Sequence, residues 1–104
     1  MLRITLLAQS TEEAILGLEG WLMGKSVQVL AAEGESRLRE SHRLVLELAG
    51  VRHIDAAGLA LLQGWSGSHL TLCAASPYLR SVLSSCGLAA NGQGTGLNSV
   101  RRDS

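Results

Sequence analysis

The sequence predicts an α/β fold with the element order β-β-α-β-α-β-α and a mixed, mostly parallel sheet. Two apolar segments near the start are joined by a short polar connection, which favours an antiparallel hairpin. Segments with helical patterning then alternate with apolar strands, as in parallel strands joined by right-handed crossovers. With 104 residues, of which 46% are hydrophobic, the chain is long enough to form one domain with a substantial core.

The hairpin is expected from residues 2–8 ("LRITLLA") and 14–22 ("AILGLEGWL"), with the first strand at an antiparallel edge. The alternative for the second segment is a helix, because the preceding "STEE" resembles an N-cap followed by acids. Gly17 and Gly20 count against that helix, since each costs about 1 kcal/mol relative to alanine.

Residues 24–41 read as an amphipathic helix that is interrupted or loosened around Gly34, with apolar positions at Val27, Leu30, Ala31 and Leu38. The third strand begins at His42 ("HRLVLELAGV"). Its run Leu44-Val45-Leu46 does not alternate with polar residues, which indicates a strand covered on both faces.

A short helix is expected from Asp55 to Trp65, and a fourth strand from His69 to Ala75 ("HLTLCAA"). Ser76 and Pro77 then form a helix-start pair, with serine as the N-cap and proline at the first helical position. The last helix places Leu79, Val82, Leu83 and Cys86 on one face, and Gly87 ends it. After Leu88 the composition becomes rich in Gly, Asn and Ser, so we expect a domain over residues 1–88 and a flexible tail over 89–104.

Composition excludes several classes of function. The formal net charge is zero, with nine basic and nine acidic residues, which argues against a mainly electrostatic nucleic-acid binder. No apolar run reaches the roughly 18–20 residues of a membrane helix, so no membrane insertion is expected. The N-terminal segment reads as a strand and not as a secretory signal. We therefore expect a cytoplasmic protein in which Cys73 and Cys86 are reduced thiols.

The stretch "LVLELAGVRHIDAAGLALL" resembles the signature of STAS domains, the family of bacterial anti-sigma factor antagonists and of cytoplasmic domains of sulfate transporters. The family's usual form is an apolar strand, an acid, Gly-Val, two residues, Ile-Asp, Ser-Ser-Gly-Leu and an apolar helix. "LEGWL" at residues 18–22 is similar to the second-strand Leu-x-Gly-x-Leu of the family, and "SPYLRSVLSSCGL" at residues 76–88 resembles its closing helix. The resemblance covers roughly residues 2–88.

The resemblance implies reversible binding to another protein. In anti-sigma factor antagonists the domain binds a kinase that sequesters sigma, and phosphorylation of the second serine of Asp-Ser-Ser-Gly ends the interaction. Here Asp55 and Gly58 match the motif, but Ala56 and Ala57 replace the serines. Ala57, at the phosphoacceptor position, has no hydroxyl and cannot accept a phosphate. The resemblance therefore implies a docking surface that is permanently in an unmodified-like state.

The turn and the following helix are the predicted partner-binding site, which comprises His53, Asp55, Ala56, Ala57, Gly58, Leu59 and Leu62. Asp55 is also expected to cap the helix, and Asp55→Lys to abolish binding with the fold intact. Trp21 and Trp65 are expected to pack in the core, with an exposed anchor for a partner as the alternative for Trp65.

Two alternatives to an anti-sigma partner stay open, and an unrecognised enzyme is a weaker third. STAS-like subunits also regulate membrane transporters, including the small subunit of phospholipid ABC transporters that binds the ATPase, and some STAS domains are reported to bind nucleotides or lipids. An enzyme is not expected, because no Ser lies in a Gly-x-Ser-x-Gly elbow. His42 and His69 lack a third metal ligand, and "MGKS" lacks the glycines of a phosphate-binding loop, so neither a metal nor a cofactor is predicted.

Overall fold

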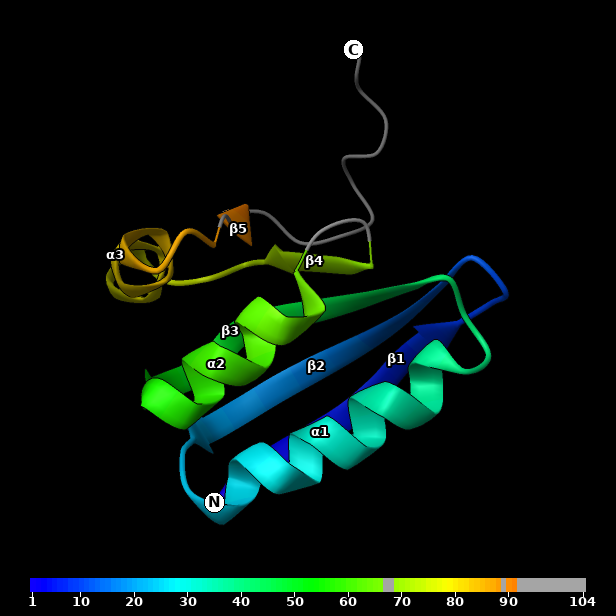
Figure 1. Cartoon of the computed structure of the whole chain (residues 1–104), viewed down its shortest axis with the longest axis horizontal. Coiled ribbons are helices and arrows are strands. Elements are labelled where there is room, and N and C mark those ends of the chain that lie inside the picture. Colours follow the sequence, from blue (N-terminus) through cyan, green and yellow to red (C-terminus); the bar gives the residue numbers. More distant parts are fainter. Residues whose placement is uncertain (67–68, 89, 92–104) are drawn as a thin grey trace, which may run out of the picture.

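The computed structural model describes residues 1–66, 69–88 and 90–91, and it confirms the predicted α/β order. The strands form one mixed sheet in the order β1-β2-β3-β4-β5, in which only the β1–β2 pair is antiparallel (Figure 1). The strands are β1 (Leu2–Gln9), β2 (Glu13–Leu22), β3 (Arg43–Ile54), β4 (Leu70–Cys73) and β5 (Ala90–Asn91). The helices are α1 (Lys25–Leu38), α2 (Ala56–Trp65) and α3 (Pro77–Ser85).

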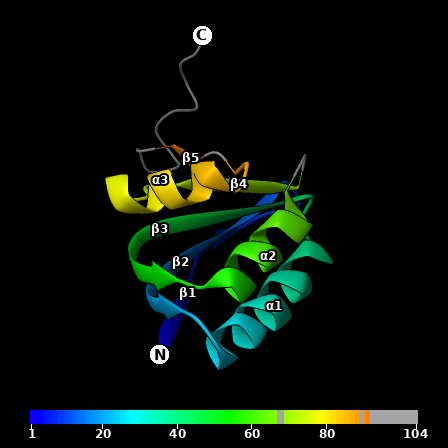
Figure 2. The ribbon, with the colours of Figure 1, turned by 60° about the vertical axis from the view of Figure 1, so that its left-hand side comes forward.

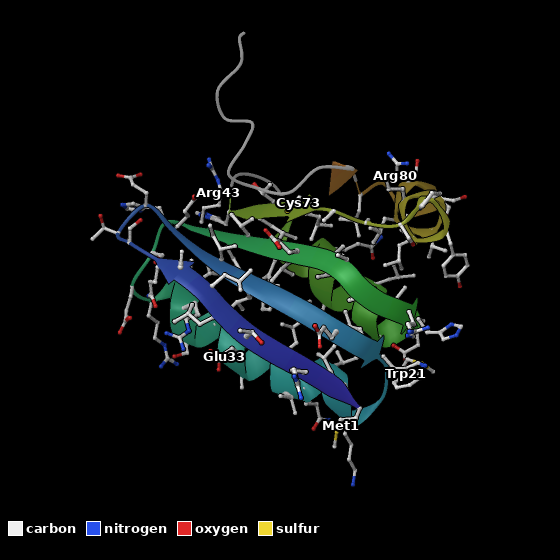
Figure 3. The ribbon with its side chains drawn as sticks, turned by 180° about the vertical axis from the view of Figure 1, so that it is seen from behind. Met1, Trp21, Glu33, Arg43, Cys73 and Arg80 are labelled. Atoms are coloured by element: carbon white, nitrogen blue, oxygen red, sulfur yellow. The ribbon has the colours of Figure 1, made fainter. Side chains whose placement is uncertain are left out.

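Helices α1 and α2 lie side by side over one face of the sheet, and α3 lies near β4 and β5 (Figure 2). Alternation along β2 turns Leu16, Leu18 and Leu22 toward these helices, where all three are fully buried. The opposite face of β1, β2 and β3 carries no helix among the described residues (Figure 3). Residues of β2 that point to this open face, such as Glu19 and Trp21, are exposed.

The predicted two-sided burial of β3 is confirmed at its start. Leu44, Val45 and Leu46 are all buried, because β2 and β4 flank the strand and side chains cover both faces there. β3 continues to Ile54, beyond the expected "HRLVLELAGV". This extension carries His53 to the end of the strand, immediately before α2.

β5 is a strand that the sequence does not predict. Ala90 pairs with Leu72 and Asn91 pairs with Cys73, so these two residues belong to the sheet and not to the expected tail. A strand of two residues is too short to show a periodic pattern in the sequence. Pairing with β4 determines its conformation. The remainder of the predicted tail, residue 89 and residues 92–104, lies outside the described residues.

Helix α1 is continuous, so the predicted interruption at Gly34 is wrong. Gly34 is buried, and a Cβ atom on it would lie 2.3 Å from Cη2 of Trp65. The glycine therefore gives the Trp65 ring space between the helix and the core. Trp65 packs against the core as expected, at the C-terminal end of α2.

Candidate functional site: a docking surface at the carboxyl ends of β2 and β3

The turn between β3 and α2 is built around Asp55. Its backbone N–H donates to the carbonyl oxygen of Leu22 at 3.2 Å, which anchors the turn to the end of β2. Its side chain is the predicted N-cap, because Oδ1 accepts a hydrogen bond from the backbone N–H of Gly58 at 2.8 Å. Asp55 thereby fixes where α2 begins.

The second carboxylate oxygen of Asp55 accepts a hydrogen bond at the start of α1. Oδ2 accepts a hydrogen bond from the backbone N–H of Gly24 at 3.1 Å, immediately before α1. Gly24 has φ of +58°, a conformation that favours glycine, and it supplies no side-chain cap to α1. One carboxylate therefore ties the starts of both helices together. Asp55→Lys would remove both hydrogen bonds, so a loss of binding in this variant would not separate a contact with the partner from a loss of stability.

These two hydrogen bonds lower the pKa of the Asp55 carboxyl below its ordinary value of 3.8. The bond from Gly58 is the larger cause and the bond from Gly24 is the second. Because the pKa is lower in the folded state, the ionised carboxylate stabilises the fold at pH values above 3.8. This stabilisation is lost as the pH falls through the folded-state pKa.

Asp55→Asn is therefore expected to remove the pH-dependent contribution of this carboxylate to the free energy of unfolding. At neutral pH the variant should have the lower free energy of unfolding, because a neutral amide oxygen is a weaker acceptor. The difference from the wild type should shrink as the pH falls well below 3.8. Urea unfolding of both proteins over this range measures it, and a difference that stays constant with pH would contradict the role of the charge.

The predicted docking residues divide into an exposed and a buried group. His53, Ala56 and Ala57 are exposed. Leu62 is fully buried in the core and cannot contact a docked partner, so its assignment as a binding residue is wrong. Gly58 is also buried, and its role is to let α2 approach the end of β2. Leu59 is half-buried and packs against the core.

Three large side chains that the sequence did not assign to the site are exposed beside these residues. Trp21 is 44% exposed, so its expected place in the core is wrong, because Leu22 takes the inward position at the end of β2. Met23 is 43% exposed in the connection to α1. Tyr78 is 56% exposed, and its ring lies edge-on to that of His53, with the centroids 6.4 Å apart.

A hollow on the sheet lies between Trp21 and His53. Trp21 pairs with His53 across β2 and β3, and both line a depression of about 630 Å³ together with Arg52 and Ser76. We use the name carboxyl-end surface for Trp21, Met23, His53, Ala56, Ala57 and Tyr78. Figure 3 shows Trp21 at the end of β2, on the open side of the sheet. Aromatic side chains of this kind are enriched at protein–protein contacts.

The two cysteines are free thiols in different environments. Cys73 is buried, and burial together with the nearby Glu47 carboxylate raises the pKa of its thiol to about 11. Cys86 is half-buried at the end of α3. The predicted reduced state therefore has a physical basis for Cys73, which stays protonated and shielded.

Alkylation at mildly alkaline pH is expected to distinguish the two thiols. Cys86 should react in the folded protein, whereas Cys73 should react only after unfolding, because it is buried and carries little thiolate. Mass spectrometry of labelled peptides reads out the two sites. A Cys86→Ser variant should lose the fast reaction, and a fast reaction that persisted in it would contradict this assignment.

The histidine pair lies at the other end of the strands. The ring Nδ1 of His69 is 3.2 Å from the carbonyl oxygen of His42, so the two residues are neighbours as expected. Among residues 1–66, 69–88 and 90–91, no group of three or more His, Cys, Asp or Glu side chains is placed to hold a metal ion. No helix in the described part of the chain is long and apolar enough to cross a membrane.

Comparison with protein families identifies the fold's relatives. The family model described as "Mlab, STAS domain" matches residues 5–97. The chain belongs to the STAS family. The match includes most of the stretch over which the sequence resembles the family, roughly residues 2–88, and continues past β5 to residue 97. A search of curated proteins finds no match.

The STAS fold is also evident from a solved structure. The anti-sigma factor antagonist SpoIIAA in its unphosphorylated form superposes with a TM-score of 0.70 at 17% sequence identity. The match covers 94% of this chain and 94% of SpoIIAA. At this identity the likeness shows the fold alone. As a STAS domain, the chain carries its motif residues Asp55 and Gly58 in structural roles, one as a cap and one in helix packing.

Proposed function

We propose that this STAS domain is a non-catalytic interaction module that binds a partner protein through the carboxyl-end surface. The observation that carries the proposal is the exposure of Ala56 and Ala57 on the first turn of α2, beside exposed aromatic side chains. The surface offers contact area but no nucleophile at the positions where the family has serines. Binding is therefore not regulated by phosphorylation at Ala57.

The candidate partners are the ATPase of a phospholipid transporter and an anti-sigma factor. The matching family model carries the description Mlab. This supports the class in which small STAS-like subunits bind the ATPase of a phospholipid transporter, and we propose such an ATPase as the partner. The second candidate is an anti-sigma factor with a kinase-like fold. The fold is similar to that of an anti-sigma factor antagonist. This likeness is at 17% identity and supports the second candidate only through the fold.

The experiment is a calorimetric titration of the purified chain against each candidate partner from the same cell. Tyr78→Ala should weaken binding by about 2 kcal/mol or more if the tyrosine is a central contact, as aromatic residues in such positions often are. Leu7→Ala is the matched control, because Leu7 is similarly exposed but lies in β1, away from this surface.

Binding of the ATPase but not of the anti-sigma factor would support the transporter assignment, and the reverse would support the second candidate. Equal loss of affinity in the Leu7 and Tyr78 variants would contradict the location of the surface. If neither partner binds, the proposed partner classes are wrong.

A further inference from the structure

Strand β1 is an open edge of the sheet. Among the described residues no strand lies beyond it, and Figure 3 shows it as the outermost strand. The carbonyl oxygen of Met1 accepts a hydrogen bond from the backbone N–H of Trp21 at 3.1 Å. Because backbone groups alternate in direction along an antiparallel strand, Leu2, Ile4 and Leu6 turn their N–H and C=O groups away from β2. These three residues form a row of donors and acceptors along the edge.

The first part of this edge, from Leu2 to Leu6, carries few of the devices that usually prevent strands from pairing. Between Leu2 and Gln9 the only charged residue is Arg3, and there is no proline. Leu6 and Leu7 are 42% and 50% exposed. The register shift between Leu6 and Ala8 leaves the first part of β1 regular and able to pair. Natural edges are normally protected by charges, prolines or bulges. Here the irregularity lies beyond Leu6 and Arg3 is the one charge, so the apolar stretch from Leu2 to Leu6 is left open to a partner strand.

We propose that β1 pairs antiparallel with β1 of a second copy of this chain, around a two-fold axis at Ile4. A strand that pairs with its own copy in this way forms an isologous contact, in which the same patch serves both subunits. The register places Leu2 opposite Leu6 of the second copy and Ile4 opposite its own symmetry mate. All three outward-facing residues then exchange hydrogen bonds, and apolar side chains meet on the helix-covered face.

Charge selects this register over its neighbours. An axis at Arg3 would place two arginines directly opposite each other, which is destabilising. An axis at Thr5 would draw the irregular segment between Leu6 and Ala8 into the pairing. With the axis at Ile4, Arg3 lies opposite Thr5 of the second copy, and within its own chain it lies opposite Glu19. The contact uses none of the side chains that define the carboxyl-end surface, and it does not depend on the proposed partner.

Sedimentation equilibrium of the full chain over a wide concentration range tests the proposal with a matched pair of variants. Thr5→Arg places a like charge opposite Arg3, twice by symmetry, and should raise the dimer Kd by about tenfold. Thr5→Glu places an opposite charge there and should lower the Kd by a similar factor. Thr5 and Glu19 line the same hollow. Within one chain, Thr5→Arg therefore adds an attractive charge near Glu19 and Thr5→Glu adds a repulsive one. The order expected for folding stability is thus the reverse of the order expected for dimerisation.

A second pair tests the outward backbone groups. Leu6→Pro removes an outward-facing N–H that makes no bond to β2, and proline is tolerated at such edge positions. This variant should be monomeric, whereas Leu6→Ala, which keeps the N–H, should still dimerise. Circular dichroism verifies that each variant is folded. A wild type that is monomeric at every concentration would overturn the proposal, as would a dimer whose Kd is unchanged by the Thr5 variants or changes in the reverse order.

Discussion

Ala57→Glu is expected to reduce partner binding by at least about a hundredfold, a loss of roughly 2.7 kcal/mol. Ala57 is exposed on the first turn of α2, beside Ala56 and within the carboxyl-end surface. A carboxylate there adds charge and bulk to a docking surface, as a phosphate would on a serine. The fold should be unaffected or slightly more stable, because the N-terminus of a helix favours negative charge by about 0.3–1 kcal/mol.

The control for this prediction is Ala57→Gln, which has nearly the same size without the charge. Calorimetric titration with the partner and thermal unfolding of each variant separate binding from stability. We expect the glutamine variant to keep a larger share of the affinity, and both variants to unfold at or near the wild-type temperature. If Ala57→Glu binds with wild-type affinity, the first turn of α2 is not part of the docking surface.

The second prediction concerns Gly58 and Gly64, two glycines of the same helix. A Cβ atom on Gly58 would lie 2.8 Å from the carbonyl oxygen of Leu22 and 2.8 Å from Cγ1 of Ile54. The backbone oxygen cannot move aside as a flexible side chain would, so α2 must shift away from the end of β2. Gly58→Ala should therefore lower the free energy of unfolding by about 1–3 kcal/mol.

Gly64→Ala is the matched control for this helix. Apart from its chain neighbours and the local helix backbone, no atom of the described residues lies within 4 Å of a Cβ placed on Gly64, so the substitution gains helix propensity without a clash. It should raise the free energy of unfolding by up to about 1 kcal/mol. Urea unfolding of the two variants should thus show shifts of opposite sign. Two shifts of the same sign would contradict the close packing of Gly58 against β2.

Local patterns in the sequence were sufficient for much of the fold. The hairpin followed from a short polar connection between apolar segments, and the two-sided burial of β3 followed from the run Leu44-Val45-Leu46. The capping roles of Asp55 and Ser76 are also confirmed, because each side chain accepts a bond from an amide three residues later. Each of these features depends on residues close together in the sequence, so the residue types at those positions are enough to predict the local backbone conformation.

Features that depend on contacts between distant segments were not predictable in this way. The bond from Gly24 to Asp55 joins residues 31 positions apart, and the Trp65 ring against Gly34 joins two helices. Alternation along β2 indicated two faces but not which one the helices cover, so Trp21 was assigned to the core. Leu62 was assigned to the surface because the family motif indicates the turn but not the direction of each side chain.

The most direct test of the central claim is to map the binding surface by NMR on the isotopically labelled chain. Backbone amide shifts should be recorded as the unlabelled partner is added. We predict that the perturbed amides cluster at the carboxyl-end surface, from Trp21 to Met23, from His53 to Ala57, and around Tyr78. Perturbations confined to the opposite end of the strands, around Leu38, Trp65 and His69, would contradict the account.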